Sequence, residues 1–187
     1  MYKRQSNGCA RGIKEVWDKV SGEFADLVLV LEGGNEEAVA LCEDKRIDLI
    51  SATGSTQMGK EIAPIVSARL GKLLLELGGN NAAIVCPSAD LDLTIKGIAF
   101  SACGTTGQRC TSLRRLFVHE DIYEDCTKRL QKCFDELVIG CPTKESSQIG
   151  PLISEASFNS MQDTINSLKD KGINISGGDR IEIEDPN

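Results

Sequence analysis

The sequence has one histidine, His119, and its aromatic residues amount to only 4%. Histidine is a common ligand of zinc and a common partner of a catalytic cysteine, so either kind of site has little to be built from. No two cysteines stand in the spacing Cys-x-x-Cys. We therefore predict no metal site. For His119, which ends a predicted strand, we predict a surface or packing role unless it approaches a cysteine in the fold.

Long apolar runs and long basic runs are also missing. No stretch of about 18 apolar residues is present, so no membrane-spanning helix is predicted. The 21 basic residues are outnumbered by 28 acidic ones, and the net charge is −7. This balance argues against a nucleic-acid partner, because such binding depends on neutralising phosphates. We expect neither a membrane nor a nucleic acid as a partner.

The eight cysteines are scattered along the chain, most of them on apolar faces of periodic segments. A free cysteine in such a place behaves as a small hydrophobic side chain. Free thiols fit a reducing compartment better than a disulfide framework does. We therefore predict a cytoplasmic location.

Predicted strands alternate with predicted helices, which is typical of an α/β fold with a largely parallel sheet. Strand-like apolar runs cover 24–31, 47–52, 72–77, 82–86 and 114–118. Helical patterns cover 6–20, 36–45, the stretch from the 54–59 turn to about 70, 90–103, 121–137 and 154–172. Pro64 lies inside one of these helices, where a proline typically costs roughly 3 kcal/mol.

Cys110 lies in the loop Gly-Gln-Arg-Cys-Thr, between a predicted helix and a predicted strand. Cysteine is a strong nucleophile once its pKa is lowered, so Cys110 is a candidate catalytic residue. The alternative for an isolated cysteine is a buried core thiol.

Glu76 ends an apolar strand directly before Gly78 and Gly79, in the stretch Glu-Leu-Gly-Gly-Asn-Asn. A carboxylate at a strand end that faces a pocket can activate a water molecule. The two glycines would let the backbone pass close to substrate and cofactor. The alternatives are a solvated strand end and an ordinary turn.

The stretch Gly-Ser-Thr-Gln-Met-Gly, residues 54–59, joins a predicted strand to a predicted helix. Unpaired N–H groups and the positive end of the helix dipole make a helix N-terminus a good phosphate site. The stretch does not have the spacing Gly-x-Gly-x-x-Gly of the common dinucleotide fingerprint, so a plain loop is the alternative.

In type, order and spacing, these three motifs resemble the NAD(P)-dependent aldehyde dehydrogenase family. The residues of the Glu76 and Cys110 motifs, together with Arg114-Arg115, are most similar to those of the antiquitin branch, the α-aminoadipic semialdehyde dehydrogenases. The resemblance covers nearly the whole chain after about residue 10. It implies oxidation of an aldehyde, such as a semialdehyde, to a carboxylic acid with NAD⁺ as cofactor, and NADP⁺ stays open.

The resemblance also implies the residue roles. Cys110 would attack the aldehyde and form a thioester after hydride transfer, and Glu76 would activate the water that hydrolyses it. Arg109 would bind the charged end of the substrate; the alternative is a salt bridge that fixes the loop. The cofactor would be bound by residues of the turns and strand ends: Gly33, Gly54, Ser55, Gly59, Leu77 and Gly78. Gly54 and Gly59 would be the tight-turn positions.

Family members run to several hundred residues, so the resemblance implies that these 187 residues are an internal piece. We predict a partial, Rossmann-like dinucleotide-binding domain over 1–75, joined to a partial α/β catalytic domain over 76–187. A mitochondrial location stays open, since the N-terminus would be missing. The full-length form is expected to be a homo-oligomer with a small-molecule aldehyde as substrate, and the piece alone is expected to be inactive. The rival hypothesis is a nucleotide-binding or redox-sensing module without dehydrogenase turnover.

Overall fold

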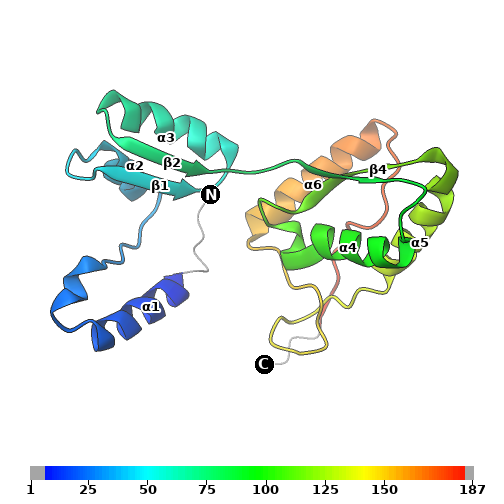
Figure 1. Ribbon diagram of the computed structural model, residues 1–187, viewed down its shortest axis with the longest axis horizontal. Coiled ribbons are helices and arrows are strands. Elements are labelled where there is room, and N and C mark those ends of the chain that lie inside the picture. Colours follow the sequence, from blue (N-terminus) through cyan, green and yellow to red (C-terminus); the bar gives the residue numbers. More distant parts are fainter. Residues whose placement is uncertain (1–6, 184–187) are drawn as a thin grey trace. The chain divides into compact units, whose positions relative to one another are not determined.

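The computed structural model describes residues 7–183, which form two compact units (Figure 1). The first unit ends at Gly78 and the second begins at Gly79. Each unit contains one small parallel sheet with helices packed on it, so the predicted α/β class is confirmed. The assignment of a cofactor role to one part and a catalytic role to the other stays a prediction.

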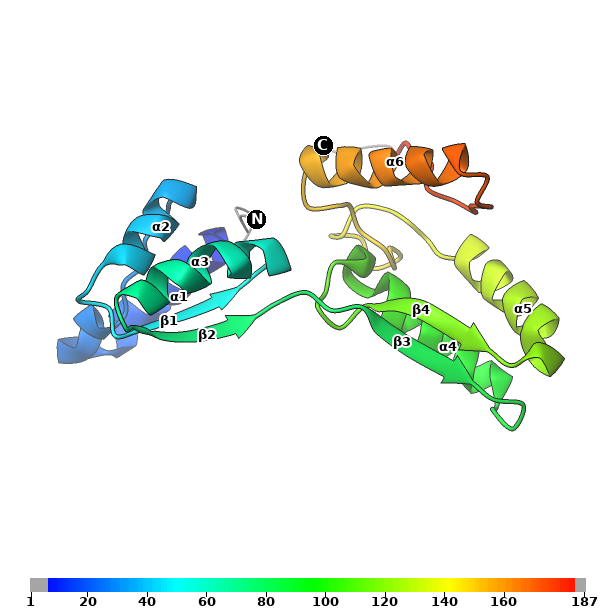
Figure 2. The ribbon, with the colours of Figure 1, turned by 90° about the horizontal axis from the view of Figure 1, so that it is seen from above.

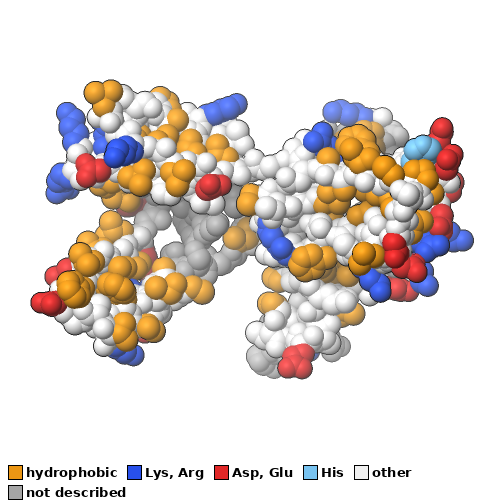
Figure 3. Space-filling view, viewed as in Figure 1, with side chains coloured by type: hydrophobic (Ala, Val, Ile, Leu, Met, Phe, Trp, Pro, Cys, Tyr) orange, Lys and Arg blue, Asp and Glu red, His pale blue; other side chains and the backbone are white. Residues whose placement is uncertain are grey.

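The chain begins with a helix, α1 (Asn7–Val20), followed by a short 3₁₀ helix, η2 (Gly22–Leu27). The helix predicted over 6–20 is therefore confirmed from residue 7 onward, and residue 6 lies outside the described residues. The strand predicted over 24–31 is wrong. A parallel strand needs a neighbour to pair with, and among the described residues no strand pairs with this segment. Four of its large apolar side chains are exposed instead: Phe24, Leu27, Leu29 and Leu31. Figure 3 shows hydrophobic side chains gathered over α1 and η2.

The rest of the first unit is a two-stranded parallel sheet with two helices on one face (Figure 2). The elements are α2 (Asn35–Glu43), β1 (Leu49–Thr53), α3 (Thr56–Ala68) and β2 (Lys72–Glu76). Leu49 pairs with Lys72 and Thr53 with Glu76, so both strands end at the same edge. Pro64 is accommodated inside α3.

Strand alternation decides which side chains of this sheet are buried. The core consists of Cys42 from α2 and of Ile62 and Val66 from α3, packed on inward-facing strand residues: Ile50, Ala52, Leu73 and Leu75. Glu76 belongs to the opposite, exposed set of β2. The core therefore orients the backbone at the strand ends, where two of the predicted motifs begin.

The second unit pairs β3 with β4 in parallel and packs α4 against β4 and α5. Its elements are β3 (Asn81–Val85), α4 (Leu91–Cys103), η3 (Gly104–Gly107), β4 (Leu113–Val118), η4 (Glu120–Ile122), α5 (Tyr123–Asp135) and α6 (Glu155–Asp170). Asp90 caps α4 by accepting from Asp92 N and Leu93 N, and Ser154 caps α6 by accepting from Ser157 N. Both caps confirm the helix starts predicted from the sequence.

Candidate functional site

Cys110 is exposed at the tip of a tight turn between η3 and β4. The turn is closed by the N–H of Ser112, which donates to the carbonyl oxygen of Arg109 at 3.2 Å. The N–H of Arg109 in turn donates to the hydroxyl oxygen of Ser112 at 3.1 Å. Ser112 is only 2% exposed and is the buried polar residue among those described. Its side chain therefore anchors the turn from beneath while Cys110 stays accessible.

Asn81, the first residue of β3, binds the same turn from the side. Its side-chain Nδ2 donates to the carbonyl oxygen of Cys110 at 2.8 Å and to that of Ser112 at 3.1 Å. Gly79 lies equally close, because a Cβ built on it would be 2.6 Å from the carbonyl oxygen of Cys110. Only glycine permits this approach without a displacement.

The two arginines at the start of β4 also hold backbone carbonyls. Nη2 of Arg114 lies 3.3 Å from the carbonyl oxygens of Gly107 and Arg109 and donates to both. Arg115 donates to the carbonyl oxygen of Asn80, at 2.7 Å from Nη2. The loop that carries Cys110 is thus bound by side chains of both strands of the sheet.

The chain enters this loop through a strained segment. Thr105 and Thr106 have φ of 55° and 56°, and Gly107 has φ of 66°. Left-handed backbone is unfavourable for a β-branched residue and is often found at functional sites. The next residue, Gln108, is fixed by its side-chain oxygen, which accepts from Ile153 N at 2.8 Å. This segment reverses the chain direction within four residues of α4.

Arg109, the predicted substrate-binding residue, contacts its own loop. Its Nε donates to Oγ1 of Thr105 at 2.9 Å, and its guanidinium lies 5.4 Å from the ring centre of Phe100. These contacts are a hydrogen bond and a cation–π contact rather than the salt bridge considered from the sequence. The guanidinium remains only partly buried, within reach of the turn that carries Cys110.

The other cysteines differ from Cys110 in their surroundings. Burial raises the pKa of the thiols of Cys42, Cys103 and Cys126, which keeps them protonated near neutral pH. Cys42 and Cys126 are fully buried, as the apolar-face prediction requires. Cys9 and Cys86, by contrast, are exposed.

Glu76 is the last residue of β2, and its side chain is exposed. Its carbonyl oxygen accepts from Gly54 N at 3.0 Å, so the Glu76 motif and the 54–59 turn meet at one sheet edge. Glu76 belongs to the first compact unit and Cys110 to the second. The structure therefore brings Glu76 together with the residues predicted for the cofactor.

The 54–59 turn forms the N-terminus of α3 at the carboxyl edge of β1. Ser55 is the N-cap, and its hydroxyl oxygen accepts from Met58 N at 3.0 Å. The N–H groups at the start of a helix lack partners within the helix, and such a helix start can bind an anion. A Cβ on Gly54 would lie 2.7 Å from Sδ of Met58, so a side chain there would displace the flexible end of the Met58 side chain.

Gly59 is not a turn position, contrary to the prediction. It is buried inside α3, where a Cβ would come within 2.7 Å of the side chain of Leu77. Its small size lets α3 pack closely on the residue that follows β2. Gly78 has free space, with Thr56 Oγ1 the nearest atom at 3.9 Å from a built Cβ. Gly33 lies before α2 and is packed against Glu37.

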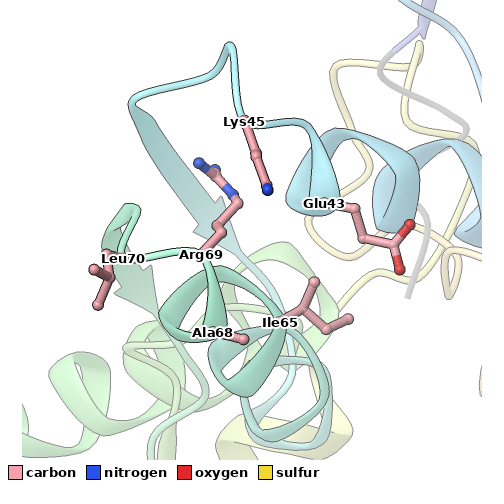
Figure 4. Close-up of a pocket in the computed structure, with 6 residues that line it drawn as sticks. All are labelled: Glu43, Lys45, Ile65, Ala68, Arg69 and Leu70. Atoms are coloured by element: carbon pink, nitrogen blue, oxygen red, sulfur yellow. The ribbon is translucent and has the colours of Figure 1, made fainter.

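A separate hollow of about 590 Å³ lies at the opposite end of α3 (Figure 4). Its lining residues are Glu43, Lys45, Ile65, Ala68, Arg69 and Leu70. Arg69 follows the last residue of α3, and its Nε donates to the carbonyl oxygen of Cys42 at 2.7 Å. None of the predicted site residues lines this hollow, so we do not assign it to the site.

His119 caps the short helix η4, since its Nδ1 accepts from Asp121 N at 3.3 Å. Its side chain is exposed, in agreement with the surface role that was one of the two predicted for it. Within residues 7–183, no group of three His, Cys, Asp or Glu side chains is placed to hold a metal ion. No helix in the described part of the chain is long and apolar enough to cross a membrane.

Comparison with known proteins identifies the family. The model of the aldehyde dehydrogenase family matches residues 5–187. The chain belongs to this family. An aldehyde dehydrogenase family 7 member A1 of Malus domestica is 43% identical over 153 residues, which cover 81% of this chain and 30% of the relative. An α-aminoadipic semialdehyde dehydrogenase of Bos taurus is 40% identical over 164 residues, 88% of this chain and 30% of the relative.

Solved structures of the family share the fold. A succinate-semialdehyde dehydrogenase of Burkholderia pseudomallei matches with a TM-score of 0.75 and 31% identity, over 81% of this chain and 32% of the other. A betaine aldehyde dehydrogenase of Staphylococcus aureus in complex with NAD⁺ matches with a TM-score of 0.79 and 26% identity, over 83% and 31%. The chain spans about 30% of the length of the curated relatives it matches.

Three residues that hold the Cys110 turn by hydrogen bonds were not among the predicted site residues: Asn81 of β3, Ser112 and Arg114 of β4. Asn81 and Arg114 were noticed only as part of a motif. The available signal was a polar residue at the start of each predicted strand: Asn81 directly before 82–86, and Arg114 as the first residue of 114–118. Ser112 had no sequence signal, because its burial depends on how the turn packs.

Proposed function

We propose that the protein containing this chain oxidises an aldehyde to a carboxylic acid with NAD⁺, and that Cys110 is the nucleophile. The single observation that carries the proposal is the exposed, multiply anchored position of Cys110 in a chain of the aldehyde dehydrogenase family. NADP⁺ stays open as the cofactor.

The thiolate of Cys110 adds to the carbonyl carbon of the aldehyde and forms a thiohemiacetal. Bound NAD⁺ supplies the acceptor for the hydride that leaves this carbon. The product of that step is a thioester on Cys110, which water must hydrolyse. Three other thiols, Cys42, Cys103 and Cys126, are poorly suited to the first step because burial raises their pKa.

Glu76 is proposed as the general base for hydrolysis. It would take a proton from the water that attacks the thioester, and Cys110 would leave as the thiolate. Its exposed side chain at the carboxyl end of β2 supports this role, since functional groups of α/β sheets gather at that edge.

The cofactor is proposed to bind at the same edge. Ser55 and the first N–H groups of α3 would bind its phosphates, and Gly54 keeps that surface free of a side chain. Leu77 and Gly78 continue from β2 toward this turn, and Gly59 supports it by letting Leu77 pack on α3. Gly33 is the least supported of the proposed contacts, because its neighbour is α2.

The proposed substrate is a semialdehyde, with α-aminoadipic semialdehyde suggested by the name of the Bos taurus relative. Arg109 is proposed to bind the charged end of such a substrate, because a guanidinium matches a carboxylate bidentately. To do so it would exchange its contact with Thr105 for one with the substrate. A homo-oligomeric state and a cytoplasmic location stay predictions.

The test is aldehyde oxidation by the complete protein with single cysteine substitutions. Cys110→Ala is expected to abolish NADH formation. Cys86→Ala, which removes another exposed thiol of the same unit, and Cys103→Ala, which removes a shielded one, should leave most of it. Equal losses from all three variants would refute the assignment. Oxidation that survives Cys110→Ala would favour a redox-sensing role for this cysteine.

A further inference from the structure

We propose that Asn81 is a positioning residue: its side-chain amide holds the Cys110 turn in the geometry from which the thiol can react. This role rests on the proposed function, because it assumes that Cys110 is the nucleophile. The hydrogen bonds themselves do not depend on it.

Both hydrogens of the Asn81 amide are used on the turn. One is donated to the carbonyl oxygen of Cys110 at 2.8 Å and the other to that of Ser112 at 3.1 Å. The two carbonyls belong to residues on either side of Thr111, so one planar group sets the direction of two peptide units. Among residues 7–183, no other side chain donates a hydrogen bond to the carbonyl oxygen of Cys110.

The position of Asn81 follows from an irregularity in the sheet. Asn81 pairs with Leu113, but Ala82 pairs with Arg115, so Arg114 has no partner across the strands. A bulge of this kind redirects side chains and is common beside active sites. Here it coincides with two side chains that both bind the loop: Asn81 to Cys110 and Ser112, and Arg114 to Gly107 and Arg109.

The side chain needed at position 81 is specified by donor count and shape. Two carbonyl oxygens face it, so it must present two hydrogens in one plane, as a primary amide does. A leucine of similar size would leave both carbonyls without this donor, and an aspartate would place a negative charge against them. If the side chain at position 81 only filled space, aspartate would disturb the turn least, because it is closest to asparagine in shape.

The experiment compares Asn81→Asp, Asn81→Ser and Asn81→Ala in the complete protein that contains this chain, with Asn80→Ala as the matched control. Asn80 is the adjacent residue of the same type; it binds Arg115 through its backbone carbonyl, which the substitution keeps. Hydrogen exchange is followed at three backbone amides of the loop that each donate a hydrogen bond: Gln108, Arg109 and Ser112.

The expected result is exchange about 5- to 30-fold faster at these amides in Asn81→Ala, the size of effect that loss of two hydrogen bonds would produce. Exchange should be faster in Asn81→Asp than in Asn81→Ala. It should be slower in Asn81→Ser than in Asn81→Ala, because serine keeps one donor. Asn80→Ala should match the unmodified chain. If Asn81→Asp is milder than Asn81→Ala, the side chain only fills space and the proposal is wrong.

A second readout tests the effect on the thiol. The rate of Cys110 alkylation by iodoacetamide, measured by peptide mass spectrometry, should change at least about threefold in Asn81→Ala. Alkylation of exposed Cys86 in the same molecules should not change. Parallel changes at both cysteines, or labelling of buried Cys126, would mean general unfolding and would overturn the positioning role. Because neither readout involves turnover, a failure of the proposed oxidation would be recognised separately.

Discussion

Gly79→Ala should loosen the Cys110 turn, because the carbonyl oxygen of Cys110 occupies the place of the new methyl group. A Cβ at position 79 would lie 2.6 Å from that oxygen, whereas ordinary contacts begin at 3.4 Å. The oxygen cannot simply retreat, since Asn81 holds it at 2.8 Å. The clash therefore falls on backbone and on a hydrogen bond rather than on a flexible side chain.

The expected cost is about 1–3 kcal/mol, the range measured when an extra carbon is forced into a packed site. Gly78→Ala is the matched control. Its new Cβ would meet only Thr56 Oγ1, at 3.9 Å, and neither Gly78 nor Gly79 has a positive φ. Alanine at position 78 should therefore be neutral, or stabilising by about 0.4–1 kcal/mol through the unfolded chain.

Two measurements on the purified chain separate the variants. Urea unfolding followed by circular dichroism gives the difference in unfolding free energy, and hydrogen exchange at Ser112 reports on the turn itself. Gly79→Ala should lower the unfolding free energy and accelerate exchange at Ser112. Gly78→Ala should leave the exchange rate unchanged and raise the unfolding free energy by no more than about 1 kcal/mol. Equal effects of the two variants would show that the loop moves away freely and that the tight approach of Gly79 has no consequence.

Four further predictions follow from individual residues. In the complete protein, Glu76→Gln should leave a burst of NADH but slow the turnover after it, because the carboxylate acts on water; loss of the burst as well would place Glu76 at an earlier step. Arg109→Ala should lower kcat/KM about tenfold or more for α-aminoadipic semialdehyde, but little for an uncharged aldehyde of similar length, because a charge-assisted hydrogen bond is worth about 1.5–3 kcal/mol. Equal losses for the two substrates would leave Arg109 only its role in the loop. The hydrogen bond from Arg46 holds the pKa of Asp44 at about 2, below its ordinary value of 3.8, so this carboxylate stabilises the fold above about pH 4 and the effect is lost as the pH falls toward 2. In urea unfolding, the difference in unfolding free energy between the unmodified chain and Asp44→Asn should therefore shrink as the pH falls from about 4 to about 2, and a constant difference would contradict this prediction. Gly97→Ala, inside α4 with nothing within 4 Å of the new Cβ, should raise the unfolding free energy by about 1 kcal/mol, and a decrease would mean that an unseen neighbour needs the space.

Local signals predicted most of the elements. Asp90 and Ser154 marked the starts of α4 and α6, because an N-cap acts on N–H groups only two or three residues away. The apolar runs before Gly78 and after Asn80 became β2 and β3. The run over 24–31 had an equally good pattern but did not become a strand, because a strand also needs a partner with which to pair.

The candidate site shows the same division. Cys110, Glu76 and the 54–59 turn could be proposed from the sequence, because each lies in a stretch of contiguous residues at the end of a periodic segment, and their roles stay predictions. The turn at Gly54 and Ser55 has the structure expected of it, whereas Gly59, placed in the same turn from its spacing, is a packing residue of α3. The spacing of glycines does not reveal which of them faces a neighbouring side chain.

By itself, the sequence determined most of the order of helices and strands, the family and the residues of the Cys110 loop, since periodicity, caps and motifs depend on neighbours along the chain. Only the tertiary structure decided how that loop is held. Asn81 and Cys110 meet because β3 and β4 pair in parallel with a shift after Asn81, and the shift brings Arg114 to the same loop. Register is set by packing between segments distant in sequence, so no local pattern could show that an asparagine at a strand start would bind the backbone of the cysteine.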